Sequence, residues 1–191
     1  MLLADVSGYS TLATRLAEQS AIGAERLSQH LNATFGVMLR EVYARVGEVE
    51  RFAGDALLAS FRPLGDGLGG AVRRARDCAQ AIAVQPNGTG TGTATNTHTN
   101  THTNEVALSV HAGVAVGALH TRHLTLPGGD KAFVLWGEPL RRVASAAMAA
   151  ASGQVQLEPA AALLAQATQA TQATNTAQTT PAPARGWTGT S

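Results

Sequence analysis

Residues 49–59 read Val-Glu-Arg-Phe-Ala-Gly-Asp-Ala-Leu-Leu-Ala, a stretch that predicts a β-hairpin. Two short segments, Glu48 to Ala53 and Ala56 to Phe61, flank the pair Gly54-Asp55. Glycine and aspartate are common in tight turns because they tolerate the backbone angles that such turns require. A hairpin placed between helical patterns indicates that the chain combines helices with antiparallel strands.

Upstream of the hairpin, the chain predicts one strand and two helices. The apolar run Leu2 to Val6 ends in Ser7-Gly8, which is typical of a buried strand that enters a turn. A first helix is expected from about Ser10 to Gln19. A second carries apolar residues at three- and four-residue spacing from Leu27 to Val46. We expect Gly47 to end it at the C′ position.

Downstream, the same patterns continue to about residue 158. They comprise a helix with apolar face Val72 to Ile82, a half-buried strand from Val106 to Val110, a hairpin that turns at Pro127 to Asp130, a helix from Glu138 to Ala151 and a last strand from Gln154 to Leu157. This order predicts an α+β fold with a ferredoxin-like βαββαβ core plus additions. Its helices should pack on one face of a mainly antiparallel sheet.

Two segments differ sharply in composition from the rest. Residues 85–104 repeat Gly, Thr, Asn and His and have little to bury, so we expect a flexible insertion. Its His98 and His102 are not expected to form a metal site, because the segment has no carboxylate or thiolate ligand. Residues 159–191 predict a short helix that opens at Pro159, followed from about Gln166 by a disordered Ala/Thr/Gln-rich tail. The expected folded domain is therefore 1–158.

Charge and hydropathy argue against several classes of partner. The 191 residues carry a formal net charge of +1, which provides no basic surface for nucleic acid or an anionic membrane. No apolar run approaches the ~18 residues of a membrane span, and the N-terminus lacks the basic region of a signal peptide. The single cysteine, Cys78, lies on an apolar helix face and predicts an inert core thiol. We therefore expect a cytoplasmic location, no nucleic-acid partner and no membrane contact by this segment.

Two aspartates are candidates for metal chemistry. Asp5 ends the first strand and Asp55 lies at the hairpin tip, and these two elements can be neighbours in a ferredoxin-like sheet. Paired carboxylates suit Mg²⁺, and two such ions can activate a hydroxyl and neutralise a pyrophosphate leaving group. The turn at 7–10 precedes a helix and offers backbone N–H groups to phosphate. The alternative is purely structural, since aspartate in hairpin turns and serine before helices are common.

Five segments, in order along residues 2–157, resemble motifs of the class III adenylate and guanylate cyclases. Leu3–Ser10 is similar to Asp-Ile-Ser-Gly-Phe-Thr, Val49–Ala59 to the Lys-Phe-x-Gly-Asp-Ala hairpin, Val110–Gly117 to Arg-x-Gly-Ile-x-x-Gly, Trp136–Leu140 to Gly-Asp-x-Val, and Gly153–Leu157 to Gly-x-Ile-x-Val. The wording of residues 52–59 most resembles the first catalytic domain of bicarbonate-responsive soluble adenylyl cyclases. The resemblance thus implies the class III nucleotide cyclase fold.

The resemblance also implies site roles, because the family forms its active sites between two cyclase domains. Asp5 and Asp55 would hold two Mg²⁺ or Mn²⁺ ions, with the Val6 carbonyl as a further ligand. The segment Gly8, Tyr9 and Ser10 would lie along the triphosphate.

Other positions depart from the family pattern. Arg51 stands where the family has its base-reading lysine, and Val134 occupies the second base-reading position. The positions of the transition-state Asn and Arg are Arg141 and Ser145. Arginine does not replace lysine at a directional site, and valine makes no hydrogen bond to a base. A homodimer would therefore lack groups for base recognition and charge stabilisation, which makes it inactive.

The expected function is formation of cyclic AMP and pyrophosphate from ATP, a phosphorus–oxygen lyase reaction, with a complementary cyclase domain as partner. GTP and cyclic GMP remain open, because the base-reading residues belong to the other half. The alternative is a catalytically inactive cyclase-homology module that binds nucleotide or a cyclase partner. His111 occupies a position that is often basic in the family and could approach phosphate, but we favour a half-buried strand residue.

Overall fold

A computed structural model describes residues 1–19, 23–84 and 108–179 of the chain. In chain order its elements are β1 (Leu2–Ser7), α1 (Tyr9–Gln19), α2 (Gly23–Ala44), β2 (Glu48–Ala53), β3 (Ala56–Ser60), α3 (Gly67–Ala83), β4 (Ser109–Val114), β5 (His120–Thr125), β6 (Lys131–Trp136), α4 (Glu138–Ala149), β7 (Val155–Leu157) and α5 (Pro159–Thr179). The order of elements through β7 confirms the predicted α+β class. The expected insertion at 85–104, with His98 and His102, lies outside the described residues.

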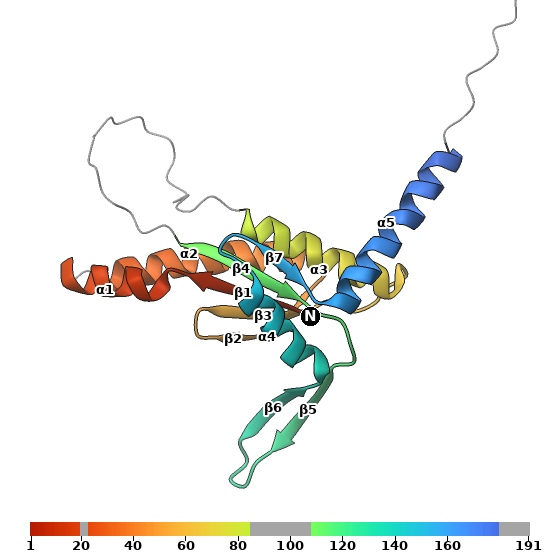
Figure 1. Ribbon diagram of the computed structural model, residues 1–191. Helices are drawn as coiled ribbons and strands as arrows, with labels where there is room; N and C mark the ends of the chain where they lie inside the picture. Colours follow the sequence, from red (N-terminus) through yellow and green to blue (C-terminus); the bar gives the residue numbers. More distant parts are fainter. Residues whose placement is uncertain (20–22, 85–107, 180–191) are drawn as a thin grey trace, which may run out of the picture.

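Five strands form the main sheet, in the order β2-β3-β1-β4-β7 (Figure 1). The pairs β2–β3, β3–β1 and β1–β4 are antiparallel, and only β4–β7 is parallel. The order of the first four strands is that of a ferredoxin-like core. The prediction that the first strand lies beside the central hairpin is therefore confirmed.

The two faces of the sheet are covered by different helices. Alternation along β1 turns Leu2, Ala4 and Val6 into the main core, against α2, α3 and the start of α5. Leu3 points to the other face, in a smaller cluster with Val143 of α4. The expectation that all helices lie on one face is therefore wrong. Helix α4 follows the projecting β5–β6 hairpin and returns along the opposite face of the sheet (Figure 1).

Helix α2 ends in a Schellman-type turn whose left-handed residue is Val46, with φ of 57°. The N–H groups of Val46 and Gly47 donate to the carbonyls of Tyr43 and Val42 at 3.1 and 2.9 Å. Gly47 therefore follows the C′ position that it was predicted to occupy. It is needed for space, because a Cβ there would lie 2.7 Å from the Phe61 ring.

Helix α5 extends to Thr179 and is longer than the short helix expected after Pro159. The reason is its composition, since alanine and glutamine favour helix even in a repetitive sequence. The small residues Ala161 and Ala165 are buried in the main core, where α5 packs against α3. Residues 180–191 of the predicted tail are outside the described part.

The β5–β6 hairpin forms a separate two-stranded sheet that projects from the body (Figure 1). All six residues of β5 are exposed. On β6, the ring of Trp136 stacks on His120 at 5.5 Å between centroids. Among the described helices, none is both long and apolar enough to span a membrane.

Candidate active site

Asp5 lies on the face of the sheet that carries α4. It is the cross-strand neighbour of Ala56 on β3 and of His111 on β4. Because side chains alternate along a strand, Asp5 shares its face with Leu3 and Ser7. The Asp5 side chain retains 36% of its exposure, so its carboxylate is open to a ligand.

Asp55 is brought close to Asp5 by the β2–β3 turn. Gly54, with φ of +67°, adopts the left-handed conformation that this turn requires. Asp55 follows it and precedes Ala56, the cross-strand partner of Asp5. Burial and the negative charge of Asp55 together raise the pKa of Asp5, against the opposing effects of His111 and the Val6 N–H. A pair of close carboxylates is a donor set that fits a hard divalent ion.

The predicted phosphate-binding segment leads directly from β1 into α1. The Val6 side chain is buried in the main core, so only its backbone can take part in a site. Gly8 has φ of +89°, and its carbonyl accepts a hydrogen bond from the Leu12 N–H at 3.0 Å. Helix α1 begins at Tyr9 and Ser10, so its first-turn N–H groups have no partner within the helix. They form a positive helix end a few residues from Asp5.

His111 contacts two residues of β1, which was not predicted. Its Nδ1 is 2.8 Å from Ser7 Oγ, and its Nε2 is 3.5 Å from Asp5 Oδ2. The His111 side chain is only 16% exposed, as expected for a half-buried strand residue. The alternation of residues 106–111 indicated its face, but its neighbours depend on the β1–β4 register.

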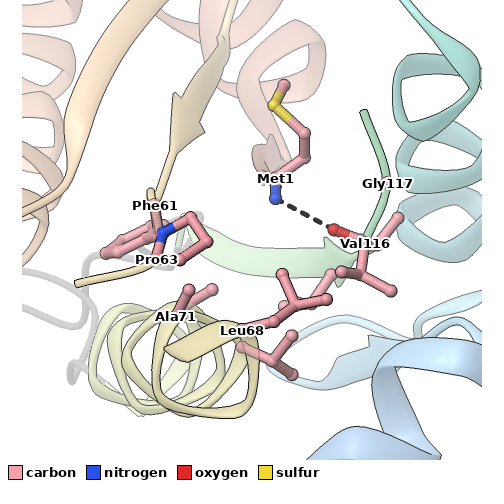
Figure 2. Close-up of a pocket in the computed structure, with 11 residues that line it drawn as sticks. Met1, Phe61, Pro63, Leu68, Ala71, Val116 and Gly117 are labelled. Atoms are coloured by element: carbon pink, nitrogen blue, oxygen red, sulfur yellow. Dashed lines mark hydrogen bonds between the residues drawn. The ribbon is translucent and has the colours of Figure 1, made fainter. Parts of the chain in front are cut away.

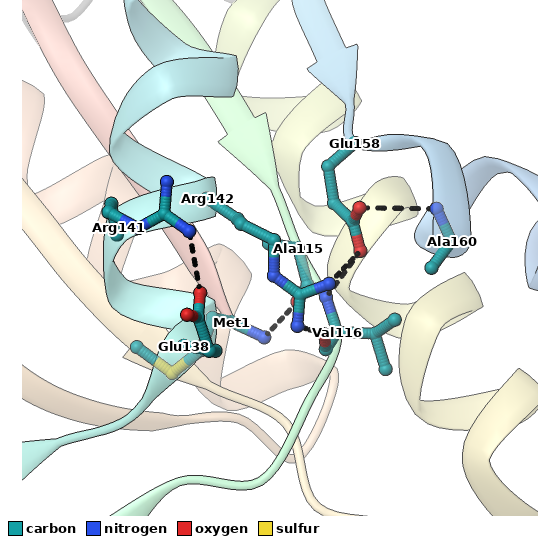
Figure 3. Close-up of polar contacts among 8 residues, drawn as sticks. All are labelled: Met1, Ala115, Val116, Glu138, Arg141, Arg142, Glu158 and Ala160. Carbon is teal, nitrogen blue, oxygen red and sulfur yellow. Dashed lines mark hydrogen bonds and ion pairs between the residues drawn. The ribbon is translucent and has the colours of Figure 1, made fainter.

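The four positions that depart from the family pattern lie on β2, β6 and α4. Arg51 is exposed on β2, and Val134 is 37% exposed on β6. On α4, Arg141 pairs with Glu138 at 3.0 Å (Figure 3). Ser145 Oγ donates to the Arg141 carbonyl. Within the described residues, these contacts include neither Asp5 nor Asp55.

One turn of α4 is joined to the sheet by an ion pair between the partly exposed Arg142 and the buried Glu158 (Figure 3). The Arg142 guanidinium donates to the Val116 carbonyl at 3.0 Å and lies 3.6 Å from Glu158. Glu158 is 8% exposed and also accepts hydrogen bonds from the N–H groups of Val116 and Ala160. This network joins α4, the end of β4 and the start of α5.

A small cavity of about 130 Å³ lies near the end of β4 (Figure 2). Its lining is largely apolar and includes Phe61, Leu68, Ala71 and Val116. None of the predicted site residues lines it, so it is separate from the candidate active site. In the described ranges, no three or more His, Cys, Asp or Glu side chains group as a metal cage. Asp5 and Asp55 would accordingly need further ligands from backbone, water or substrate.

Comparison with solved structures identifies the fold. Over 87% of this chain and 79% of its own, the adenylyl cyclase CyaB from P. aeruginosa superimposes with a TM-score of 0.64 at 15% identity. The dimeric guanylyl cyclase domain of the RhoGC fusion protein from Blastocladiella emersonii gives the same TM-score and identity over 87% and 82%. The guanylate cyclase domain of RhGC from Catenaria anguillulae, in complex with GTP, gives 0.60 at 14% identity over 85% and 79%.

The fold is therefore that of nucleotide cyclase catalytic domains. No protein-family model matches the sequence, and a search of curated proteins also gives no match.

Proposed function

We propose that this domain supplies the metal-binding half of a nucleotide cyclase active site. With a complementary cyclase domain, it would convert ATP to cyclic AMP and pyrophosphate. The observation that carries the proposal is the closeness of Asp5 and Asp55 at one edge of a cyclase fold, where burial and the charge of Asp55 raise the pKa of Asp5. A fold without a cation-binding role has no physical need for that arrangement.

Each residue of this half then has a defined task. Asp5 and Asp55, with the Val6 carbonyl, would hold two Mg²⁺ or Mn²⁺ ions. When bound, such ions lower the pKa of the ribose 3′-hydroxyl and offset charge on the triphosphate. The N–H groups at the start of α1, from Gly8 to Ser10, would donate hydrogen bonds to phosphate oxygens.

A partner domain is required for the remaining tasks. Val134 offers no hydrogen bond to a base, and Arg141 is held in an ion pair with Glu138. Base recognition and stabilisation of the developing charge would therefore come from the partner. One similar solved structure is described as a dimeric guanylyl cyclase domain and another as a guanylate cyclase domain with GTP. These descriptions make GTP the alternative substrate here.

The test is reconstitution with a cyclase domain that carries the complementary Lys, Asn and Arg. Cyclic nucleotide and pyrophosphate are measured with Mn²⁺ and ATP or GTP, for the chain alone and for the mixture. We expect turnover only in the mixture, and a loss of at least ~10³-fold on Asp55→Ala, because two-metal catalysis contributes several kcal/mol. Asp77→Ala is the matched control, since Asp77 pairs with Arg76 on α3, remote from this face.

The second candidate is an inactive module that binds nucleotide or pairs with a cyclase, which the residues at Val134, Arg141 and Ser145 favour. It predicts binding of nucleotide or partner without pyrophosphate release in any mixture. The result that would support this module is no cyclic nucleotide and no pyrophosphate, from the chain alone or from the mixture, when sedimentation shows that the chain is folded and paired with its partner. That result would contradict the catalytic proposal.

A further inference from the structure

The contacts of His111 define a short row of side chains that crosses from β1 to β4. Ser7 and Asp5 lie on one face of β1, two residues apart, and His111 lies directly opposite Asp5 on β4. The imidazole sits between them, with Nδ1 at 2.8 Å from Ser7 Oγ and Nε2 at 3.5 Å from Asp5 Oδ2. A cross-strand register of this kind holds side chains in place without a loop.

One tautomer of the ring satisfies both neighbours. An ionised carboxylate only accepts hydrogen bonds, so the tautomer that suits Asp5 carries its proton on Nε2. In that tautomer, Nδ1 accepts the Ser7 O–H. Ser7 thus orients the ring, and the ring presents an N–H to Asp5.

The exposures of the two groups suit a supporting role. The His111 side chain is 16% exposed and that of Asp5 is 36% exposed, so the ring is the less accessible of the two. The 3.5 Å separation is longer than an ordinary N–H···O hydrogen bond, and the contact therefore acts mainly as an electrostatic restraint. Partners that hydrogen-bond a ligating carboxylate fix its orientation, and their loss typically costs metal affinity about 10- to 100-fold.

We propose that His111, oriented by Ser7, is a positioning residue that holds the Asp5 carboxylate in the orientation needed to bind a divalent cation. This inference rests on the proposed function and deepens it, because it assigns His111 to the support of Asp5. His111 does not ligate the metal.

The experiment measures binding of Mn²⁺ alone to the full chain, from the electron paramagnetic resonance signal of the free ion. We expect His111→Ala to weaken binding by about 10-fold or more. His111→Gln should recover most of that loss, because its amide N–H can replace the imidazole donor to Asp5. Ser7→Ala should cause a smaller loss. His120→Ala is the matched control, because His120 lies on the projecting hairpin against Trp136.

Spectroscopy of the same variants separates positioning from a structural effect. With ¹⁵N-labelled histidine, Ser7→Ala should shift Nδ1 of His111 and leave His120 unchanged, while thermal melts establish that the variants remain folded. Nitrogen hyperfine coupling from His111 to bound Mn²⁺ would identify a direct ligand and overturn the positioning role.

Failure of this inference can be told apart from failure of the proposed function. Loss of Mn²⁺ binding on Asp5→Ala but not on His111→Ala contradicts the role of His111 alone. Mn²⁺ binding that is absent from the wild-type chain, or unaffected by Asp5→Ala, contradicts the metal assignment and with it both proposals.

Discussion

Two regions of this domain offer very different chemistry. At β1, β3 and β4, two carboxylates lie close together, and a partly buried histidine backs one of them. On β6 and α4, the corresponding surface carries Val134, Ser145 and an arginine already paired with Glu138. Backbone similarity to cyclase domains extends over 87% of the chain. A shared fold therefore does not require that both regions carry the side chains that the resemblance implies.

The largest effect should come from restoring two positions of α4 together with the base-reading position on β2. We predict that the triple variant Arg51→Lys/Arg141→Asn/Ser145→Arg forms cyclic nucleotide without a partner domain. The expected gain over the wild-type chain alone is about 10²-fold or more, because one donor to developing charge typically contributes 10²–10³-fold. The measurement is cyclic nucleotide formed with Mn²⁺ and ATP or GTP at a protein concentration where sedimentation shows dimers.

Asp55→Ala in the triple-variant background serves as its control and should remove the gained activity. Equal turnover by the unmodified chain alone would show that the two regions do not differ as we infer. No gain in a folded, dimeric triple variant would lead to the same conclusion.

A second prediction concerns the packing that joins the two regions. A Cβ at Gly113 on β4 would lie 2.4 Å from the Ala147 backbone N and 2.5 Å from the Val143 carbonyl of α4. Gly113→Ala should therefore push α4 off the sheet and lower the free energy of unfolding by about 2–3 kcal/mol. Urea denaturation measures this, and Gly65→Ala, which meets no atom within 4 Å, should stay within about 0.5 kcal/mol of wild type. Similar losses in both variants would mean that α4 is not tightly docked.

Much of the fold could be predicted because local signals agreed with the global arrangement. Apolar alternation and the Gly54 turn predicted the first strand and the β2–β3 hairpin, and the ferredoxin-like order brought Asp5 beside that hairpin. The strand predicted from Val106 is instead β4, Ser109–Val114. The contact of His111 with Ser7 could not be predicted, since the two are 104 residues apart and meet only through strand register.

Other features were missed because composition and structure gave competing signals. The repetitive Ala/Thr/Gln sequence predicts disorder, but Ala161 and Ala165 are small enough to pack closely, which supports helix α5. Glycine is the usual left-handed residue at a helix end, yet Val46 occupies that position because Gly47 is needed beside Phe61. Helix propensity therefore extends α5 beyond its packed start, and tertiary packing decides the outcome at Gly47.

A third prediction compares the two ion pairs that adjacent arginines of α4, Arg141 and Arg142, form. Glu158→Gln removes a charge that is 8% exposed and has Arg142 and two N–H groups as partners, so it should cost about 1–2 kcal/mol of stability. Glu138→Gln removes a charge that is 65% exposed and should cost about 0.5 kcal/mol or less. Thermal and urea denaturation of both variants provide the comparison. A larger loss for Glu138→Gln would contradict the assignment of Glu158 as the group that anchors α4.

The smallest predicted effect is a gain in stability rather than a loss, and it concerns Asp5. Because the pKa of Asp5 is raised in the folded state, its ionisation destabilises the fold as pH rises through that pKa. Asp5→Asn cannot ionise and should therefore be more stable than wild type at pH 7 without metal. Solvent screening limits the gain to about 0.5 kcal/mol, or ~1–2 °C in Tm.

The pH and metal dependence of this difference identify its cause. The gain should vanish below the ordinary aspartate pKa of 3.8, where Asp5 is neutral in both the folded and unfolded states. Saturating Mn²⁺ should reverse the order, since binding stabilises only the chain that retains the carboxylate. Asp77→Asn, which loses an ion pair with Arg76, should show neither the gain nor the reversal. A Tm for Asp5→Asn below that of wild type at pH 7 without metal would mean that Asp5 is stabilised by its neighbours. The inferred contrast between two crowded carboxylates at the sheet edge and the exposed surface of α4 would then no longer hold.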